Sequence, residues 1–313
     1  TGFSKFWTNL GKVRFWGYEL ELTTRNIVKK NFSWESKLVL SYQQNKVLKL
    51  PDNGIAKNRT GGIALGDGTF FGGIAEGEPL NRFYGYVATG IIETEEQAAN
   101  ANYDALSRLP QKGAKRVGDY EWADRNGDGQ ITTADQFCLG VTVPPFTGGL
   151  QNSFRLKNWT LSLYLDWATG HSIFDESYSR YFYGTFTNNY ALAKDVLKAW
   201  KKPGDKTKYA KFYANDSNWG NDNYNRRATN TFTYKGDYLC LREITLQYSL
   251  PSKLFTKVGL KGVTLTVSGN NLYYFTEVKG ISPEAGSSTT YDGDVFYNYP
   301  PIRRFSFGVR LIF

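Results

Sequence analysis

The sequence has no methionine, one histidine and two cysteines in 313 residues. With His171 as the only histidine, both a His-rich metal centre and a Ser-His-Asp site are disfavoured. Cys138 and Cys240 lie far apart in the chain, which indicates two unpaired thiols rather than a disulfide framework. With no initiator methionine and no signal peptide, we expect Thr1 to be an internal position of a longer protein or the start of a processed piece.

Long hydrophobic runs are also absent. No segment approaches the roughly 20 apolar residues of a transmembrane helix, and the mean hydropathy is −0.47. Low hydropathy does not exclude a membrane protein, because the strands of a transmembrane barrel alternate apolar and polar residues. Aromatic residues make up 16% of the chain, as expected where strands cross membrane interfaces or loops stack on sugars.

The C-terminal segment is the clearest amphipathic strand. Its alternate side chains are all apolar or aromatic: Phe305, Phe307, Val309, Leu311 and Phe313. The intervening positions are mostly polar, so one face suits lipid and the other suits water. A strand that ends on a C-terminal Phe is typical of outer-membrane barrel proteins, and we interpret these five residues as a barrel-assembly signal.

Six further segments show the same period of two residues, so the sequence predicts an all-β protein with antiparallel strands. The seven predicted strands are Val13–Arg25, Phe32–Gln43, Leu150–Leu156, Trp159–Trp167, Tyr238–Leu250, Val263–Tyr273 and Arg303–Phe313. Only Lys157 and Asn158 separate two of them, which predicts a two-residue hairpin turn. The phase slips between Leu241 and Ile244, which indicates a β-bulge.

The connections alternate between short and long. The short ones cover about residues 26–31, 157–158 and 251–262, and the long ones 44–146, 168–237 and 274–302. Outer-membrane barrels have short periplasmic turns and longer extracellular loops, so we expect the three long segments outside the cell. Within them we expect an extracellular β-element at Arg82–Ile92, paired with Gly72–Ile74, and a helix at Tyr190–Trp200.

The formal net charge is +9. Many of the lysines fall in the short turns, where a barrel would place them beside anionic lipid headgroups. A nucleic-acid-binding surface would cluster basic and aromatic residues on one face, so we expect no nucleic-acid partner.

Residues 124–135 match a twelve-residue calcium loop. The predicted ligands are Asp124, Asn126, Asp128, Gln130 through its carbonyl, and Asp135. Gly129 occupies the sixth position, where a sharp turn is needed. No amphipathic helix flanks the loop, so we expect structural Ca²⁺ rather than a sensor; the alternative is a solvated turn without metal.

Aromatic residues are interleaved with Asn and Asp in the second and third long loops. Such surfaces pack against sugar rings or peptides, or against other loops and partner proteins. The candidates for contact with a ligand or a lid are Tyr178, Tyr181, Tyr183, Phe186, Trp219, Tyr224, Tyr291 and Tyr297. No motif selects a carboxylate pair, a nucleophile or a phosphate-binding glycine loop, so we expect no enzymatic activity.

Several motifs, in order, resemble the C-terminal part of the SusC/RagA-type TonB-dependent transporters of Bacteroidetes. They begin with Thr1-Gly-Phe, Trp7-Thr-Asn and Gly17-Tyr-Glu-Leu-Glu-Leu, followed by Gly77-Glu-Pro with Phe83-Tyr-Gly-Tyr. They continue with Asp124-Arg-Asn-Gly-Asp-Gly, Tyr238-Leu-Cys-Leu-Arg-Glu-Ile, Val267-Ser-Gly-Asn-Asn-Leu and Tyr299-Pro-Pro-Ile-Arg-Arg. As an ordered set they span nearly the whole chain.

The resemblance implies that residues 1–313 form about the last third of a barrel of about 22 strands. It also implies a bacterial outer-membrane location and a plug domain outside this chain. The implied partners are the remainder of the same transporter, a SusD-like surface lipoprotein that acts as a lid, the TonB complex and outer-membrane lipid. The implied function is import of oligosaccharides or peptides. The alternatives are a glycan-binding adhesin or scaffold without active transport, and a barrel hydrolase, which the lone His171 disfavours.

Overall fold

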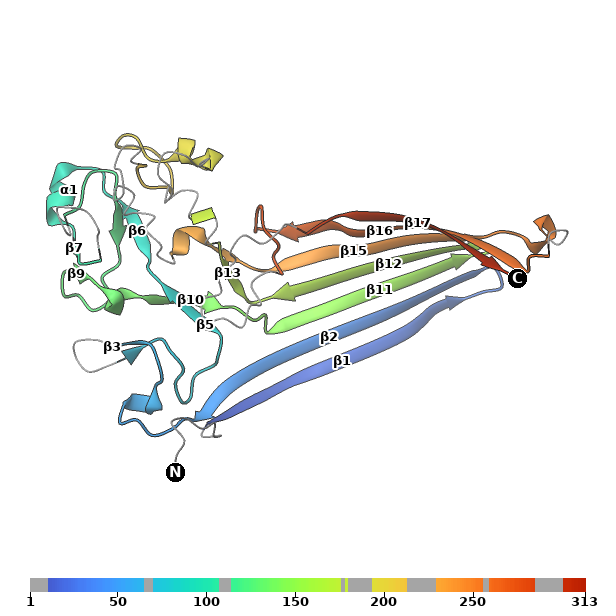
Figure 1. Cartoon of the computed structure of the whole chain (residues 1–313), viewed down its shortest axis with the longest axis horizontal. Coiled ribbons are helices and arrows are strands. Elements are labelled where there is room, and N and C mark those ends of the chain that lie inside the picture. The colour runs from blue at the N-terminus through green and yellow to red at the C-terminus, as the bar shows by residue number, and fades with distance from the viewer. Residues whose placement is uncertain are drawn as a thin grey trace, which may run out of the picture.

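The structure is a computed structural model that describes residues 11–64, 70–106, 114–175, 178–179, 193–212, 229–255, 259–284 and 301–313. It consists of one long antiparallel sheet and, at one end of it, a group of loops with short strands and helices (Figure 1). The three short turns between strands lie at the other end, where the chain also ends.

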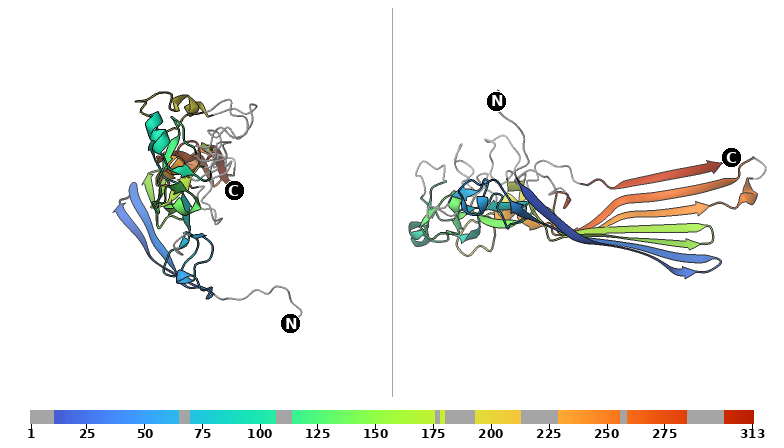
Figure 2. Two further views of the ribbon diagram at one scale, coloured as in Figure 1. Left: turned by 90° about the vertical axis from the view of Figure 1, so that its left-hand side faces the viewer. Right: turned by 90° about the horizontal axis from the view of Figure 1, so that it is seen from below.

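The sheet confirms the seven predicted strands. Its order is β1-β2-β11-β12-β15-β16-β17, and every neighbouring pair is antiparallel. The strands are β1 (Lys12–Val28), β2 (Phe32–Lys49), β11 (Phe146–Leu156), β12 (Trp159–Thr169), β15 (Tyr238–Ser249), β16 (Gly262–Thr276) and β17 (Arg304–Ile312). Viewed from below, they diverge toward the short turns (Figure 2).

The strand register places side chains of one kind on each face. One row across all seven strands is apolar: Ile27, Trp34, Phe154, Leu161, Leu246, Val267 and Phe307. A neighbouring row on the opposite face is polar: Arg25, Glu35, Ser153, Ser162, Thr245, Ser268 and Ser306. We call these the outer and inner faces. An outer face of large exposed hydrophobic side chains suits lipid rather than water.

Two details of the predicted strands are confirmed, and several strands are longer than predicted. Leu156 pairs with Trp159, so the turn has two residues, and Lys157 adopts the left-handed conformation (φ 52°) that such a turn needs. The bulge in β15 falls at Arg242, which has no partner on β12. Strand β2 extends to Lys49 instead of ending near Gln43, because it pairs with β1 as far as Lys12. Strand β11 begins at Phe146 instead of Leu150, because Phe146 already pairs with Tyr42 of β2.

Both edges of the sheet are open among the described residues. β1 pairs only with β2, and β17 pairs only with β16. Nearly every residue of these two strands is exposed, including Phe307 at 82%. An open edge presents unpaired backbone groups, so this sheet requires further strands on both sides. None of the helices in the described ranges is long and apolar enough to cross a membrane.

The segment between β2 and β11 forms small strand pairs rather than one extended loop. Its strands are β3 (Ile63–Ala64), β4 (Phe70–Phe71), β5 (Arg82–Gly85), β6 (Ala88–Ile91), β7 (Tyr103–Asp104), β8 (Tyr120–Trp122), β9 (Gln130–Ile131) and β10 (Phe137–Val141). Its helices are α1 (Glu95–Asn100) and the 3₁₀ turns Ala56–Asn58 and Thr133–Asp135. A capping box formed by Thr94 and Gln97 starts α1.

The second long connection contributes β13 (Ser172–Phe174), β14 (Thr233–Lys235) and 3₁₀ turns at Lys194–Lys198 and Asn230–Phe232. A further 3₁₀ turn, Ser252–Leu254, lies between β15 and β16. β13 and β14 pair with each other.

The predicted β-element at Arg82–Ile92 is confirmed but its predicted partner is wrong, and the predicted helix in the second long connection is wrong. Arg82–Ile92 forms two strands, which pair with β10 and β8 rather than with Gly72–Ile74. Ile74 instead bridges to Thr60. The predicted helix at Tyr190–Trp200 is, within the described residues, a 3₁₀ turn at Lys194–Lys198. It stops there because the Trp200 amide donates a hydrogen bond to the Tyr209 carbonyl (2.9 Å).

A single hydrophobic core joins the first two long connections. Phe83, Tyr120 and Trp122 come from the first, and Phe174, Tyr209 and Phe232 come from the second. We call this unit the loop domain. The Asn230 side chain fixes the junction, since it accepts a hydrogen bond from the Ala88 amide (2.9 Å) and donates one to the Ala88 carbonyl (3.2 Å).

The two faces of the sheet predict opposite responses to an added charge. Leu165→Arg in the full-length protein places a guanidinium on the outer face, between Leu150 and Leu241. An arginine near the membrane midplane costs about 2–4 kcal/mol, so we expect little folded barrel in isolated outer membranes, measured by heat-dependent mobility in SDS gels.

The matched control is Ser162→Arg, on the inner face of the same strand, which we expect to be tolerated. An equal loss of folded protein in both variants would contradict the assignment of the two faces.

Candidate functional site

The inner face contains a recess near the end of the sheet that carries the loop domain. Its volume is about 440 Å³. Polar side chains and glycine backbone surround it: the lining residues are Lys37, Val39, Ser41, Thr147, Gly148, Gly149, Gln151, Tyr164, Asp166, Trp167 and Tyr238. The recess therefore offers hydroxyl, amide and charged groups beside aromatic rings.

Two adjacent glycines shape this part of the wall. A Cβ atom at Gly149 would lie 3.0 Å from the Tyr164 hydroxyl, and one at Gly148 would lie 2.3 Å from the Trp167 ring. Both aromatic side chains therefore lie over strand β11 where it has no side chains, one on each face. Larger residues at 148 and 149 would displace the two rings.

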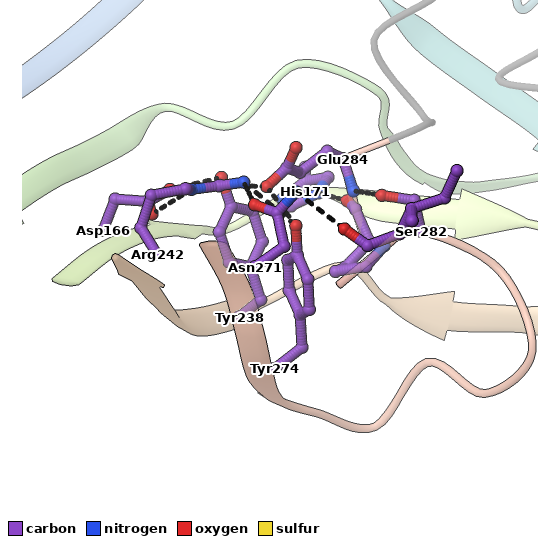
Figure 3. Close-up of polar contacts among 10 residues, drawn as sticks. Asp166, His171, Tyr238, Arg242, Asn271, Tyr274, Ser282 and Glu284 are labelled. Carbon is purple, nitrogen blue, oxygen red and sulfur yellow. Dashed lines mark hydrogen bonds and ion pairs between the residues drawn. The ribbon is translucent and has the colours of Figure 1, made fainter. Parts of the chain in front are cut away.

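Arg242 is the centre of an ion-pair network next to the recess (Figure 3). Its Nε and Nη2 atoms each donate to the Asp166 carboxylate at 2.7 Å. Its Nη1 donates to the Asn271 amide oxygen (2.8 Å) and to the Tyr274 hydroxyl (3.0 Å). Nη2 also pairs with Glu284. A bidentate pair of this kind fixes the orientation of the guanidinium as well as its charge.

Bulges in neighbouring strands bring these groups together. Arg242 is the additional residue in β15, and the register of β16 slips at the same level, where Asn271 adopts a left-handed φ of 53°. A bulge redirects side chains that a regular strand would place differently. The sequence predicted the bulge but gave no indication that Asp166 and Glu284 would meet there.

Contacts with the sheet and with the loop domain hold the described part of the segment that follows β16. Glu284 pairs with Arg242 on the sheet. The His171 Nε2 atom lies 3.1 Å from the Pro283 carbonyl oxygen and donates to it in the tautomer protonated at Nε2. Val278 packs against Ile173 of the loop domain. Residues 277–284 therefore connect the sheet to the loop domain, and the only histidine has a structural contact rather than a catalytic partner.

In the predicted calcium loop, the donor types fit Ca²⁺ but the carboxylates are already hydrogen-bonded within the loop. Asp124 accepts from the amides of Gly127 (2.7 Å) and Gly129 (2.8 Å), and Asp135 accepts from the amides of Arg125 (2.9 Å) and Thr132 (2.7 Å). Within the described residues, no group of three or more His, Cys, Asp or Glu side chains is arranged to hold a metal ion. Calcium binding stays a prediction.

Of the aromatic contact candidates, the structure describes only Tyr178. Its ring packs edge-on against Phe232, with centroids 6.3 Å apart, and its hydroxyl donates to Asp195 at 2.7 Å. These contacts favour the packing alternative for Tyr178. Tyr181, Tyr183, Phe186, Trp219, Tyr224, Tyr291 and Tyr297 lie outside the described residues.

Asp175 is a buried acid of the loop domain. One of its carboxylate oxygens accepts a hydrogen bond from the Tyr178 amide at 2.9 Å. Burial disfavours the charged form and raises the pKa of this carboxyl to about 6. Cys138 and Cys240 are both free thiols, as predicted.

Comparison with known proteins gives the chain its family. It is 30% identical to TonB-dependent receptor P3 of Formosa agariphila over 326 residues, which cover 100% of this chain and 30% of that protein. It is 23% identical to TonB-dependent receptor SusC of Bacteroides thetaiotaomicron, covering 97% of this chain and 27% of SusC. The chain belongs to the SusC/RagA-type TonB-dependent transporters. No protein-family model matches it.

The fold agrees with this family. The structure matches a chain of the RagAB peptide transporter with a TM-score of 0.70 at 20% identity, covering 99% of this chain and 30% of that one. The sheet is thus part of the wall of an outer-membrane β-barrel. The chain spans about 30% of the length of the relatives it matches. These relatives are named as receptors and transporters, in agreement with a protein that is not an enzyme.

The family places the two faces of the sheet. In an outer-membrane barrel the apolar face contacts lipid and the polar face lines the interior. The recess and the Arg242 network are therefore in the interior of the barrel, on the side of the extracellular loops.

The Arg242 network predicts a local effect on the segment after β16. Arg242→Gln leaves Asp166 and Glu284 without their cation. We expect the free energy of unfolding to fall by about 1–3 kcal/mol, less than for a fully buried ion pair, because all three side chains are only partly buried. In Glu284→Gln, Arg242 keeps its ion pair with Asp166, so the free energy of unfolding should fall by less. In the full-length protein, both variants should increase amide hydrogen exchange over residues 277–284.

Unchanged exchange in Glu284→Gln would show that Arg242 does not hold this segment. The thermal midpoint of Arg242→Gln should fall further than that of Glu284→Gln.

Proposed function

We propose that the full-length protein imports oligosaccharides or peptides across the outer membrane and draws its energy from the TonB complex. The observation that supports this most strongly is the similarity to TonB-dependent receptors along the entire chain, combined with a sheet that is apolar outside and polar inside. The remainder of the transporter would supply the strands that the open edges of β1 and β17 require, and a plug domain inside the barrel.

In this proposal the sheet is one wall of the transport pathway, and the recess beside Tyr164 and Asp166 lines that pathway. A mixture of aromatic rings, hydroxyls and amides suits both sugars and peptides. RagAB, which has a similar fold, is a peptide transporter. The proposal therefore includes peptides as well as glycans as substrates.

The loop domain is the proposed surface for a SusD-like lipoprotein lid. It lies at the end of the sheet opposite the short turns (Figure 1), and extracellular loops of an outer-membrane barrel are at that end. Its shared core makes the first two long connections one rigid unit, and a rigid unit can support a partner better than two separate loops.

A glycan-binding adhesin or scaffold is the competing function, and uptake measurements separate the two. Cells of the producing bacterium would be given mixed isotope-labelled glycans and peptides, with and without the full-length gene, and with and without a proton uncoupler. We expect gene-dependent accumulation of one class inside the cells, abolished by the uncoupler. Surface binding without energy-dependent accumulation would refute import and favour the adhesin.

We also propose that residues 124–135 bind a structural Ca²⁺ ion, with oxygen ligands from Asp124, Asn126, Asp128 and Asp135 and from the Gln130 carbonyl. Supporting this, Gly127 and Gly129 have left-handed φ values of 74° and 78°, which allow the chain to fold its oxygens around one point. The ion would stabilise the loop between β8 and β10.

Calcium binding predicts a stability that depends on the metal. A chelator should lower the thermal midpoint of the full-length protein, and the double variant Asp124→Ala with Asp128→Ala should have the lower midpoint with no response to chelator. Asp52→Ala is a matched control, because Asp52 also caps an exposed turn, through the Gly54 amide, but lies outside the loop. A parent protein that is indifferent to chelator would rule out the calcium site.

A further inference from the structure

Two cations lie on the outer face of the sheet, beyond its apolar region. Arg14 on β1 and Lys46 on β2 are direct partners in the strand register, and both are exposed. We call them the outer cation pair. Because side chains alternate along a strand, the pair shares its face with Leu20 and Leu40 on the lipid-facing side. It therefore faces away from the recess and from the interior of the barrel.

The position of the outer cation pair along the strands places it above the hydrocarbon. From Phe32 at the short turn, ten residues of β2 lead to Tyr42. With about 3.4 Å per residue and a tilt of about 40°, this separation corresponds to roughly 26 Å of height, which agrees with an apolar band about 25 Å tall. Lys46 is four residues further along β2, roughly 10 Å higher. The pair is thus at the level of the lipid headgroups on the extracellular side.

Aromatic rings lie between the apolar region and the outer cation pair. Tyr18 and Tyr42 are partners in the register and stack, with ring centroids 6.5 Å apart. Aromatic girdles of this kind lie where hydrocarbon meets headgroups. Trp16 follows on the same face, and the Arg14 guanidinium carbon lies 5.7 Å from the centroid of its ring. This cation–π contact orients the guanidinium at the headgroup level.

The outer cation pair has no acidic partner in the described part of the chain. There, neither side chain forms an ion pair or donates a hydrogen bond. Residues 12–18 and 38–49 of the two strands contain no Asp or Glu, and Lys12 and Lys49 add two positive charges at the end of the pairing. The N–H groups of Arg14 and Lys46 can therefore donate to an anion from outside the chain.

Two acidic residues close to Lys46 have partners elsewhere. The loop after β2 passes beside the Lys46 side chain. In this loop, Glu76 accepts from the Asn58 side chain at 3.0 Å, and Glu78 accepts from Arg59 at 2.6 Å. These carboxylates are held within the loop, so they do not replace an external anion at the outer cation pair.

We propose that Arg14 and Lys46 bind a phosphate group of lipopolysaccharide, the lipid of the outer leaflet. Guanidinium and ammonium groups both bind phosphate through charge-assisted hydrogen bonds. The acyl chains of the same lipid would lie against Tyr18, Tyr42 and the leucines below them. A soluble phosphate compound would use the two cations alone, whereas a lipid uses the cations, the rings and the apolar region on one pair of strands.

The first test measures lipid binding to the delipidated full-length protein in detergent by native mass spectrometry. The probe is monophosphoryl lipid A, compared with the same lipid after enzymatic removal of its phosphate. We expect the wild type to bind the phosphorylated form about tenfold more tightly or better, because each contact to the phosphate is charge-assisted. The double variant Arg14→Gln with Lys46→Gln should lose this preference.

The matched control is Lys29→Gln with Lys30→Gln, which removes two charges from the turn between the same two strands, at the periplasmic end. It should keep the wild-type preference. Equal binding of the two lipid forms by the wild type, or equal losses in the two double variants, overturns the proposal. Phosphatidylglycerol bound as tightly as lipid A also overturns it, because the site would then accept any anionic lipid.

A second test removes the ring and keeps both charges. Trp16→Leu leaves an apolar side chain on the outer face but no ring to orient Arg14, so the preference for phosphorylated lipid A should fall about two- to fivefold. The control Tyr273→Leu on β16 removes another exposed ring of the outer face, whose partner is Phe275 at 4.7 Å. Equal effects of the two variants overturn the arrangement of the site. None of these outcomes depends on whether the protein imports a substrate.

Discussion

The structure depends on one constraint: a backbone that crosses a membrane must satisfy all its hydrogen bonds, and only helices and closed barrels do so. In this chain the constraint is met between strands, so each strand needs a neighbour on both sides. The seven strands satisfy one another except at the outer edges of β1 and β17. Those two edges explain why the sheet must be completed by strands from the rest of the transporter.

The same constraint separates the chemistry of the two faces. Since side chains alternate across a strand, a lipid-facing row must be apolar while the next residue remains free to be polar. The inner face uses this freedom for the recess and for the Arg242 network. The network lies where β-bulges break the strict alternation, and it connects the barrel wall to residues 277–284 and so to the loop domain.

How well the sequence predicted each feature depends on the range of the contacts involved. Strands such as β12 and β17 follow from local alternation, and the Lys157–Asn158 turn from spacing alone. The pairing of β5 with β10 and the core shared by Phe83 and Phe232 depend on contacts between distant residues, which a local pattern does not encode. The helix prediction at Tyr190–Trp200 was wrong for a related reason: an apolar stripe did not reveal that Trp200 pairs with Tyr209.

In the candidate site, too, the local features could be predicted from the sequence and the long-range contacts could not. The slip of phase at Arg242 indicated a bulge, but the convergence of Asp166, Asn271 and Glu284 on it came only from the fold. The spacing in residues 124–135 identified oxygen donors, whereas the structure showed that Asp124 and Asp135 already accept backbone hydrogen bonds. Spacing therefore predicts which atoms are available to a metal, and not whether they are arranged around it.

The most direct test of the barrel wall is a spin-label scan along β16 in the full-length protein, with one label at each position from Thr264 to Ser268. Accessibility to oxygen, which partitions into lipid, and to a water-soluble nickel complex would be compared at each site. We predict high oxygen accessibility at Leu265 and Val267 and low accessibility at Thr264, Thr266 and Ser268. A profile without this alternation would contradict the assignment of the sheet as a lipid-facing barrel wall.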